Sequence, residues 1–71
     1  MRNTFFRATV SGVAEFHDSD TVENLQSWAN IYYPKNCSVC IRSNYTSDGS
    51  LWTPCNGRIV SVRENGRWIR F

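Results

Sequence analysis

The sequence predicts an α+β fold in which one amphipathic helix packs on a small antiparallel sheet of roughly three to five strands. Two observations predict this class. One segment repeats its apolar residues at helical spacing, and several shorter segments alternate as strands do or flank turn residues. We expect the order strand, helix, strand, a short optional strand, and a C-terminal hairpin.

The chain has 71 residues, of which 41% are apolar and 14% are aromatic. This length predicts a single domain over residues 1–71 and excludes the large scaffolds on which many enzymes are built. There are only four glycines and two prolines, so the composition is that of a folded globular chain rather than a disordered or collagen-like one.

Residues 4–10 alternate as a strand does. Three apolar side chains share one face of this strand: Phe6, Ala8 and Val10. Ser11 and Gly12 then interrupt the pattern. Because glycine within a strand pattern is typical of a bulge or a sharp bend, we expect residues 13–16 to continue the strand in a shifted direction.

Residues 21–32 form the one predicted helix. Asp20 and Glu23 resemble a capping box at its start, and Pro34 ends it because the residue before a proline avoids the α conformation. The stripe that we expect to face the sheet, flanked by Trp28, contains Val22, Leu25, Ala29 and Tyr32.

The C-terminal half contains a further strand, a short strand and the two arms of a hairpin, at residues 37–45, 51–53, 58–64 and 67–71. Asn56-Gly57 is a turn signal before the hairpin. Asn65-Gly66 is the strongest short-range hairpin signal and predicts a two-residue turn.

A two-residue turn fixes the hairpin register, so that Glu64 pairs with Arg67 and Arg63 with Trp68. One face then carries four apolar side chains: Val60, Val62, Ile69 and Phe71. The other face carries Ser61, Arg63, Trp68 and Arg70. We expect the helix to cover the apolar face and to leave exposed the face with a tryptophan between two arginines.

Charge is unevenly distributed along the chain. Residues 13–34 carry a net charge of −4 and residues 35–71 carry +4, and seven of the eight cations are arginine. Arginine and tryptophan dominate protein-binding hot spots, and they also stack bases and grip phosphates. The residues predicted to bind a partner are Arg63, Trp68 and Arg70, supported by Arg42 and Arg58. The alternative is a solvated face on which arginine stems merely cover Trp68.

The cysteines raise the question of a metal site. Cys37 and Cys40 have the Cys-x-x-Cys spacing of zinc ligands, and Cys55 and His17 complete a possible set of four. Against this, positions i and i+3 of a strand point to opposite faces. We therefore expect small, half-buried cysteines and no cofactor, and keep zinc as the less favoured alternative.

No pattern in the sequence predicts catalysis. His17 is the only histidine, and no glycine-rich phosphate loop, Gly-x-Ser-x-Gly or His-Glu-x-x-His motif occurs. We expect a protein that is not an enzyme. The odd number of cysteines and the lack of a long apolar run predict a cytoplasmic chain without a membrane partner.

A short chain of this layout whose last strand follows Asn65-Gly66-Arg67-Trp68 resembles the small accessory proteins of bacteriophages and prophages, among them some anti-CRISPR proteins. The resemblance implies binding to a host protein complex, often at a surface built to hold nucleic acid. The chain lacks the strong acidity of the commonest such inhibitors, so charge mimicry of nucleic acid is not implied, and no functional residue is carried over.

The function that we expect is therefore that of a non-enzymatic interaction module, which binds and modulates a host macromolecular complex through a protein partner. Nucleic-acid binding by the same Arg/Trp face and a zinc-stabilised mini-domain are the alternatives. A homodimer also stays open, since so small a chain has little stability to spare and an exposed edge strand invites pairing.

Overall fold

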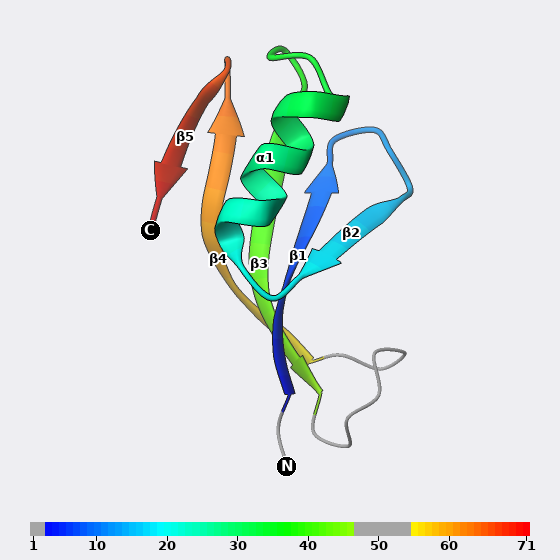
Figure 1. The fold of residues 1–71 in the computed structure, drawn as a ribbon, viewed down its shortest axis with the longest axis vertical. Helices are drawn as coiled ribbons and strands as arrows, with labels where there is room; N and C mark the ends of the chain where they lie inside the picture. The colour runs from blue at the N-terminus through cyan, green and yellow to red at the C-terminus, as the bar shows by residue number, and fades with distance from the viewer. Residues whose placement is uncertain (1–2, 47–54) are drawn as a thin grey trace.

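The computed structural model describes residues 3–46 and 55–71, which form one helix on one face of a five-stranded antiparallel sheet (Figure 1). The strand order is β2-β1-β3-β4-β5. The elements are β1 (Asn3–Val10), β2 (Phe16–Ser19), α1 (Val22–Tyr32), β3 (Val39–Thr46), β4 (Cys55–Glu64) and β5 (Arg67–Arg70). The predicted fold class is confirmed, while the expected short strand at 51–53 lies outside the described residues.

The N-terminal strand ends in a reversal of the chain. Gly12 has a φ of 81°, and the backbone N–H of Val13 donates to the Val10 carbonyl at 3.0 Å. The chain then returns as β2, antiparallel to β1, with Phe16 opposite Thr9. The expectation that residues 13–16 continue the first strand is wrong, because the left-handed conformation that Gly12 adopts closes a turn.

Helix α1 begins one residue later than predicted. The N-cap is Thr21, whose Oγ1 accepts the backbone N–H of Asn24 at 3.2 Å, and the capping-box role expected of Asp20 is not observed. The stripe is confirmed for its first three members, Val22, Leu25 and Ala29, which are buried. Tyr32 is 68% exposed, whereas Tyr33 is half-buried and packs against the core.

Strand β4 pairs with β3 through two register shifts. The Asn56-Gly57 turn signal is wrong, since both residues lie inside β4. Glycine is required there because a Cβ at Gly57 would overlap the Ser43 carbonyl oxygen. The shifts place Ile59 opposite Arg42, and Val62 opposite Cys40. Since residues opposite each other share a face, Ile59 and Val62 lie on the same side of the sheet.

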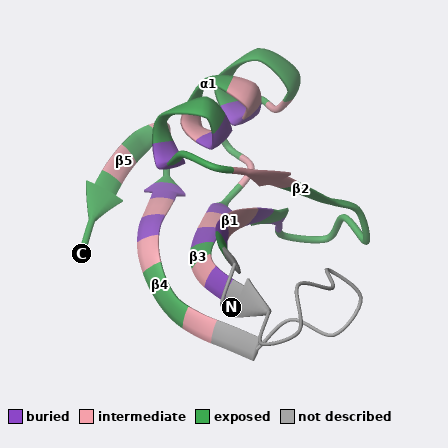
Figure 2. Cartoon of the chain, turned by 60° about the horizontal axis from the view of Figure 1, so that its bottom comes forward, coloured by how far each residue is buried: buried purple, intermediate pink, exposed green. Residues whose placement is uncertain are grey.

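The C-terminal hairpin has the predicted register, with Glu64 opposite Arg67 and Arg63 opposite Trp68. Asn65 and Gly66 have φ values of 52° and 79°, as the tight turn requires. The prediction of which face is covered is wrong. Arg63 is only 1% exposed, whereas Phe71 is 79% exposed, so α1 covers the face that carries the arginine (Figure 2).

Arg63 is buried against the C-terminal end of α1. Its Nη1 donates to the Ala29 carbonyl and to the Asn30 Oδ1, both at 3.2 Å. Its Nη2 donates to three further carbonyls, of Tyr33 at 3.3 Å, Pro34 at 2.7 Å and Cys37 at 3.1 Å. We call these five acceptors the carbonyl cage.

The end of α1 explains why an arginine is buried here. The last carbonyls of a helix have no partner within the helix, and they carry the negative end of its dipole. The last turn of α1 contains no basic residue, and Pro34 follows soon after it. Arg63 therefore supplies from β4 both the donors and the positive charge that the helix end requires.

Replacing Arg63 by methionine removes these donors while keeping an apolar stem of similar length. We expect the free energy of unfolding to fall by about 2–4 kcal/mol, because the Tyr33 and Cys37 carbonyls lose the donor that Arg63 gives them and the helix end loses its buried positive charge. Urea unfolding followed by circular dichroism measures the change. Arg67→Met, at an exposed position of the same hairpin, is the matched control. Equal stability of the two variants would show that the carbonyl cage contributes nothing.

Candidate functional site

The structure places three of the predicted partner-binding residues against the helix. Arg63 is enclosed in the carbonyl cage, and its guanidinium carbon lies 5.8 Å from the centre of the Trp68 ring. Trp68 donates through Nε1 to Asn30 Oδ1 at 3.2 Å, and Arg70 forms an ion pair with Glu23 at 3.1 Å. Arg63 is therefore an internal residue that is too deeply buried to reach a partner, whereas Trp68 is half-buried and Arg70 is exposed.

The ion pair of Arg70 lies at the surface. The pKa of Glu23 is lowered, first by the hydrogen bond that its carboxylate accepts from its own backbone N–H and then by the one from Arg70. Both side chains are more than half exposed, so water and salt screen their attraction and we ascribe to it little of the stability.

The other two predicted binding residues, Arg42 and Arg58, are exposed. Arg42 lies on β3 opposite Arg7 of β1 and Ile59 of β4. These neighbours place it on the sheet face away from α1, which we call the open face. Of the predicted set, Arg42 is thus the residue that belongs to a broad surface with no described element over it.

The predicted zinc ligands do not come together. Cys40 pairs with Val62, whereas Cys55 pairs with Tyr45, five residues or about 17 Å further along β3. His17 lies on the helix side, where its ring stacks on Trp28 with centroids 4.7 Å apart. Cys37 precedes β3 at the margin of the core. Within residues 3–46 and 55–71, no three His, Cys, Asp or Glu residues are grouped as a metal ion requires.

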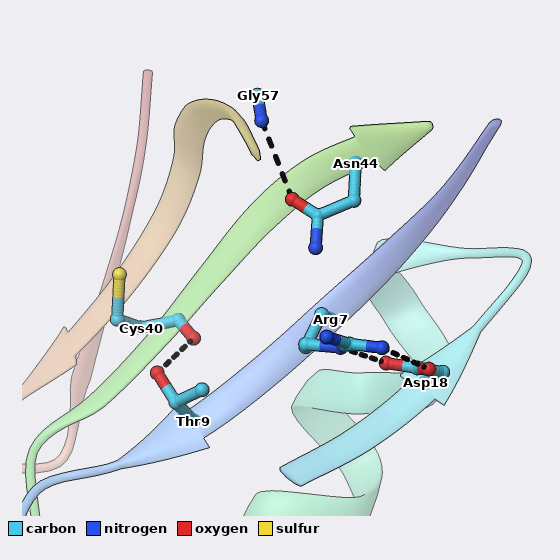
Figure 3. Close-up of polar contacts among 6 residues, drawn as sticks. All are labelled: Arg7, Thr9, Asp18, Cys40, Asn44 and Gly57. Atoms are coloured by element: carbon cyan, nitrogen blue, oxygen red, sulfur yellow. Dashed lines mark hydrogen bonds and ion pairs between the residues drawn. The ribbon is translucent and has the colours of Figure 1, made fainter. Parts of the chain in front are cut away.

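The open face carries a row of side chains that crosses all five strands. The register places these residues side by side: Phe16, Thr9, Cys40, Val62 and Ile69. We call them the apolar row. Phe16 is 54% exposed and Ile69 is 48% exposed, while Cys40 and Val62 in the middle are half-buried. Figure 3 shows Thr9 donating through Oγ1 to the Cys40 carbonyl at 3.5 Å.

A second row beside it carries charge. Arg7 binds the carboxylate of Asp18 through two hydrogen bonds, of 2.7 Å and 3.0 Å (Figure 3). The guanidinium carbon of Arg7 also lies 3.8 Å from the centre of the Phe16 ring. The Asp18 carboxylate raises the pKa of Arg7, mainly through these hydrogen bonds. Because Arg7 is paired with Asp18, the exposed cation of this row without a described carboxylate partner is Arg42.

A hollow of about 300 Å³ lies where the apolar row crosses from β1 to β4. Its lining includes three members of the row: Thr9, Cys40 and Val62. Ser11 and Ser38, joined by a backbone hydrogen bond of 3.0 Å, also line it. The hollow lies where β1 and β4 end and β3 begins, beside the apolar row, and suits a protruding apolar group.

The apolar row was not predicted from the sequence. Its members come from five strands, so the row exists only through registers that no single segment encodes. One signal was available: residues 16, 62 and 69 are apolar at positions where strands facing water usually carry polar side chains.

Comparison with family models, with curated proteins and with solved structures finds no match for this chain. The class of protein that the fold defines is a small α+β domain with one helix on one face of a five-stranded antiparallel sheet, over the residues that the structure describes. Within the part of the chain that is described, no helix has the length and apolar character needed to cross a membrane.

Asp18→Asn tests the role of the charged row. Without the carboxylate, Arg7 and Arg42 face each other as like charges, and we expect the free energy of unfolding to fall by about 1 kcal/mol at low salt. The loss is expected to shrink as salt screens the repulsion. Urea unfolding at low and high sodium chloride measures both effects. Glu15→Gln, in the exposed turn after β1, is the control; a loss that is the same at every salt concentration would contradict the electrostatic explanation.

Proposed function

We propose that this protein is a non-enzymatic interaction module that binds a protein partner through the open face of its sheet. The observation that carries the proposal is the apolar row, which crosses five strands on a face over which no described element lies. Of the residues predicted to bind a partner, Arg42 lies on this face, whereas Arg63 is buried against α1.

The exposure of the apolar row supports a docking role. An antiparallel sheet with one face in water usually carries polar side chains on that face. Here Phe16 and Ile69 are each about half exposed, and Ile59 is 36% exposed on the same face. Four strand spacings give the row a length of roughly 19 Å, which suits a protein interface of ordinary size.

The charges indicate which chemistry the partner carries. Arg7 is occupied by Asp18, whereas Arg42 is exposed at the side of the row. A matching surface presents an apolar group to the hollow and a carboxylate to Arg42. Arginine at the border of an apolar patch is a common interface anchor, because its planar head forms paired hydrogen bonds with a carboxylate.

The same charges favour protein over nucleic acid. A surface that binds a phosphate backbone carries many cations along one groove. The open face instead places Asp18 beside Arg7, and Glu64 opposite Arg67. Two of its cations are thus matched by nearby carboxylates, which leaves Arg42 as the main positive group.

The hollow supports a role in binding rather than catalysis. Cys40 and Glu64 line it, whereas His17 lies on the opposite side of the sheet with its ring against Trp28. A cysteine nucleophile needs a base within hydrogen-bond reach. The His17 imidazole is not within reach of Cys40, because it lies on the other side of the sheet. The resemblance to phage accessory proteins suggests a host protein complex as the source of the partner.

Recovery of the partner is the first step of the test. A tagged copy purified from its native host should bring down one protein in stoichiometric amount, which is then purified and titrated against variants by calorimetry. We expect Arg42→Glu and Phe16→Ala each to weaken binding roughly ten- to a hundredfold, as losses at interface anchors do.

Matched controls lie away from the open face. Lys35→Glu makes the same charge change in the exposed segment after α1, and Ile31→Ala removes an apolar side chain that is 73% exposed on the helix. Both should bind as the wild type does. Unchanged binding by Arg42→Glu and Phe16→Ala contradicts the proposed face, and retardation of single-stranded DNA or RNA that falls steeply with salt favours the nucleic-acid alternative.

A further inference from the structure

Strand β5 forms one edge of the sheet, and the direction of its backbone groups is fixed by the hairpin. The Phe71 N–H donates to the Val60 carbonyl at 3.0 Å. Because alternate residues of an antiparallel strand bond to the same neighbour, Arg67, Ile69 and Phe71 direct their backbone groups toward β4. The N–H and C=O groups of Trp68 and Arg70 therefore point outward, away from the sheet, and no described element lies beyond them (Figure 1).

The outward backbone groups of Trp68 and Arg70 can form hydrogen bonds with a second, antiparallel copy of β5. Only a few registers bring these groups together. If the two-fold axis passes through Ile69, Trp68 of each copy lies opposite Arg70 of the other, and both outward residues are paired. An axis through Arg70 places two arginines opposite each other, which is unfavourable. An axis through Trp68 leaves Arg70 opposite the turn residue Gly66. The register centred on Ile69 is the one that satisfies the edge.

The side chains agree with this register. With the axis at Ile69, each arginine of one copy lies opposite an aromatic residue of the other, and Ile69 lies opposite Ile69. This follows from the sequence Arg67-Trp68-Ile69-Arg70-Phe71. Trp68 faces Arg70 on the helix side, and Arg67 faces Phe71 on the open side. An arginine over an aromatic ring is an attractive pair. Charges that usually protect an edge strand from pairing thus become part of the contact.

Exposure supports the same conclusion. Ile69 is 48% exposed and Phe71 is 79% exposed in the single chain. We propose that the protein forms a homodimer by antiparallel pairing of the two β5 strands about Ile69, which joins the two five-stranded sheets into one. The axis is perpendicular to the sheet, so both helices lie on one side and both open faces on the other. The dimer is a separate inference from the proposed function, which concerns a face rather than an edge.

Sedimentation equilibrium over a range of concentrations tests the dimer. We expect the wild type to approach twice the 8.2 kDa mass of one chain. Ile69→Lys places two like charges at the axis and should weaken the dimer roughly tenfold or more. Ile31→Lys, a matched change on the exposed face of α1, should leave it unchanged. Circular dichroism of each variant confirms that the monomer is folded.

Disulfide formation tests the register independently. Residues opposite each other at a non-hydrogen-bonded pair have Cα atoms about 4.5 Å apart, within reach of a disulfide. Ile69→Cys should therefore form a dimer under oxidising conditions, with two thiols giving one S–S bond and two electrons and two protons passing to dissolved oxygen. In Phe71→Cys the two new thiols are four positions apart across the axis, roughly 13 Å, and should not cross-link. Wild type treated alike reports any cross-linking by the native cysteines.

Three results overturn the proposal. These are a wild type that sediments as a monomer at all concentrations, a dimer unaffected by Ile69→Lys, and a Phe71→Cys protein that cross-links as readily as Ile69→Cys. Ile69 belongs to both the apolar row and the β5 edge, so partner binding is tested at Phe16 and Arg42, which lie away from β5. A monomer that binds its partner through the open face overturns the dimer alone. A dimer whose partner binding is unchanged by Arg42→Glu and Phe16→Ala overturns the proposed face alone.

Discussion

The position of α1 on the sheet depends on the burial of one guanidinium group. Arg63 enters the carbonyl cage from β4 and meets the end of the helix with five hydrogen bonds and, among the described residues, no carboxylate partner. Burying an unpaired cation is usually costly, and its Nε has no described partner. The cost is offset here because the helix dipole and the carbonyl oxygens together act as the counter-charge. Removing either side leaves buried polar groups without partners.

This contact divides the interface between helix and sheet into two halves of different character. Toward β1 and β3 the helix packs through apolar side chains, including Leu25, Ala29 and Ile41. Toward β4 and β5 it packs through a polar network, in which Gln26 donates to Ser61 at 3.2 Å and Trp68 donates to Asn30. Because the polar side of the hairpin is turned to α1, its apolar side, with Val62 and Ile69, is left on the open face. The candidate binding surface is therefore a consequence of how the helix is anchored.

Most of the fold follows from local patterns, and most of the site does not. The stripe of α1 and the register of the terminal hairpin are set by residues close together in the sequence, and both were predicted. The covered face of the hairpin was predicted wrongly, because apolar character was the criterion and Arg63 satisfies its burial by hydrogen bonds to a distant helix end. The apolar row requires the β3–β4 register, whose shifts near Gly57 and Ser43 are visible only in three dimensions. One sequence feature could have predicted the burial of Arg63. The last turn of α1 has no basic residue and no glycine cap, so its carbonyls need a donor from elsewhere in the chain.

The carbonyl cage also bears on the order in which the chain folds. Its hydrogen bonds join residues 26 to 34 positions apart, across the whole of β3. Until β4 has paired with β3, the end of α1 lacks the donors of Arg63, so its last turn frays as in an isolated helix. The helix and the C-terminal hairpin therefore stabilise each other, which favours the all-or-none unfolding that is usual for a small single domain. Amide exchange at the end of α1 then reports global unfolding rather than local fraying.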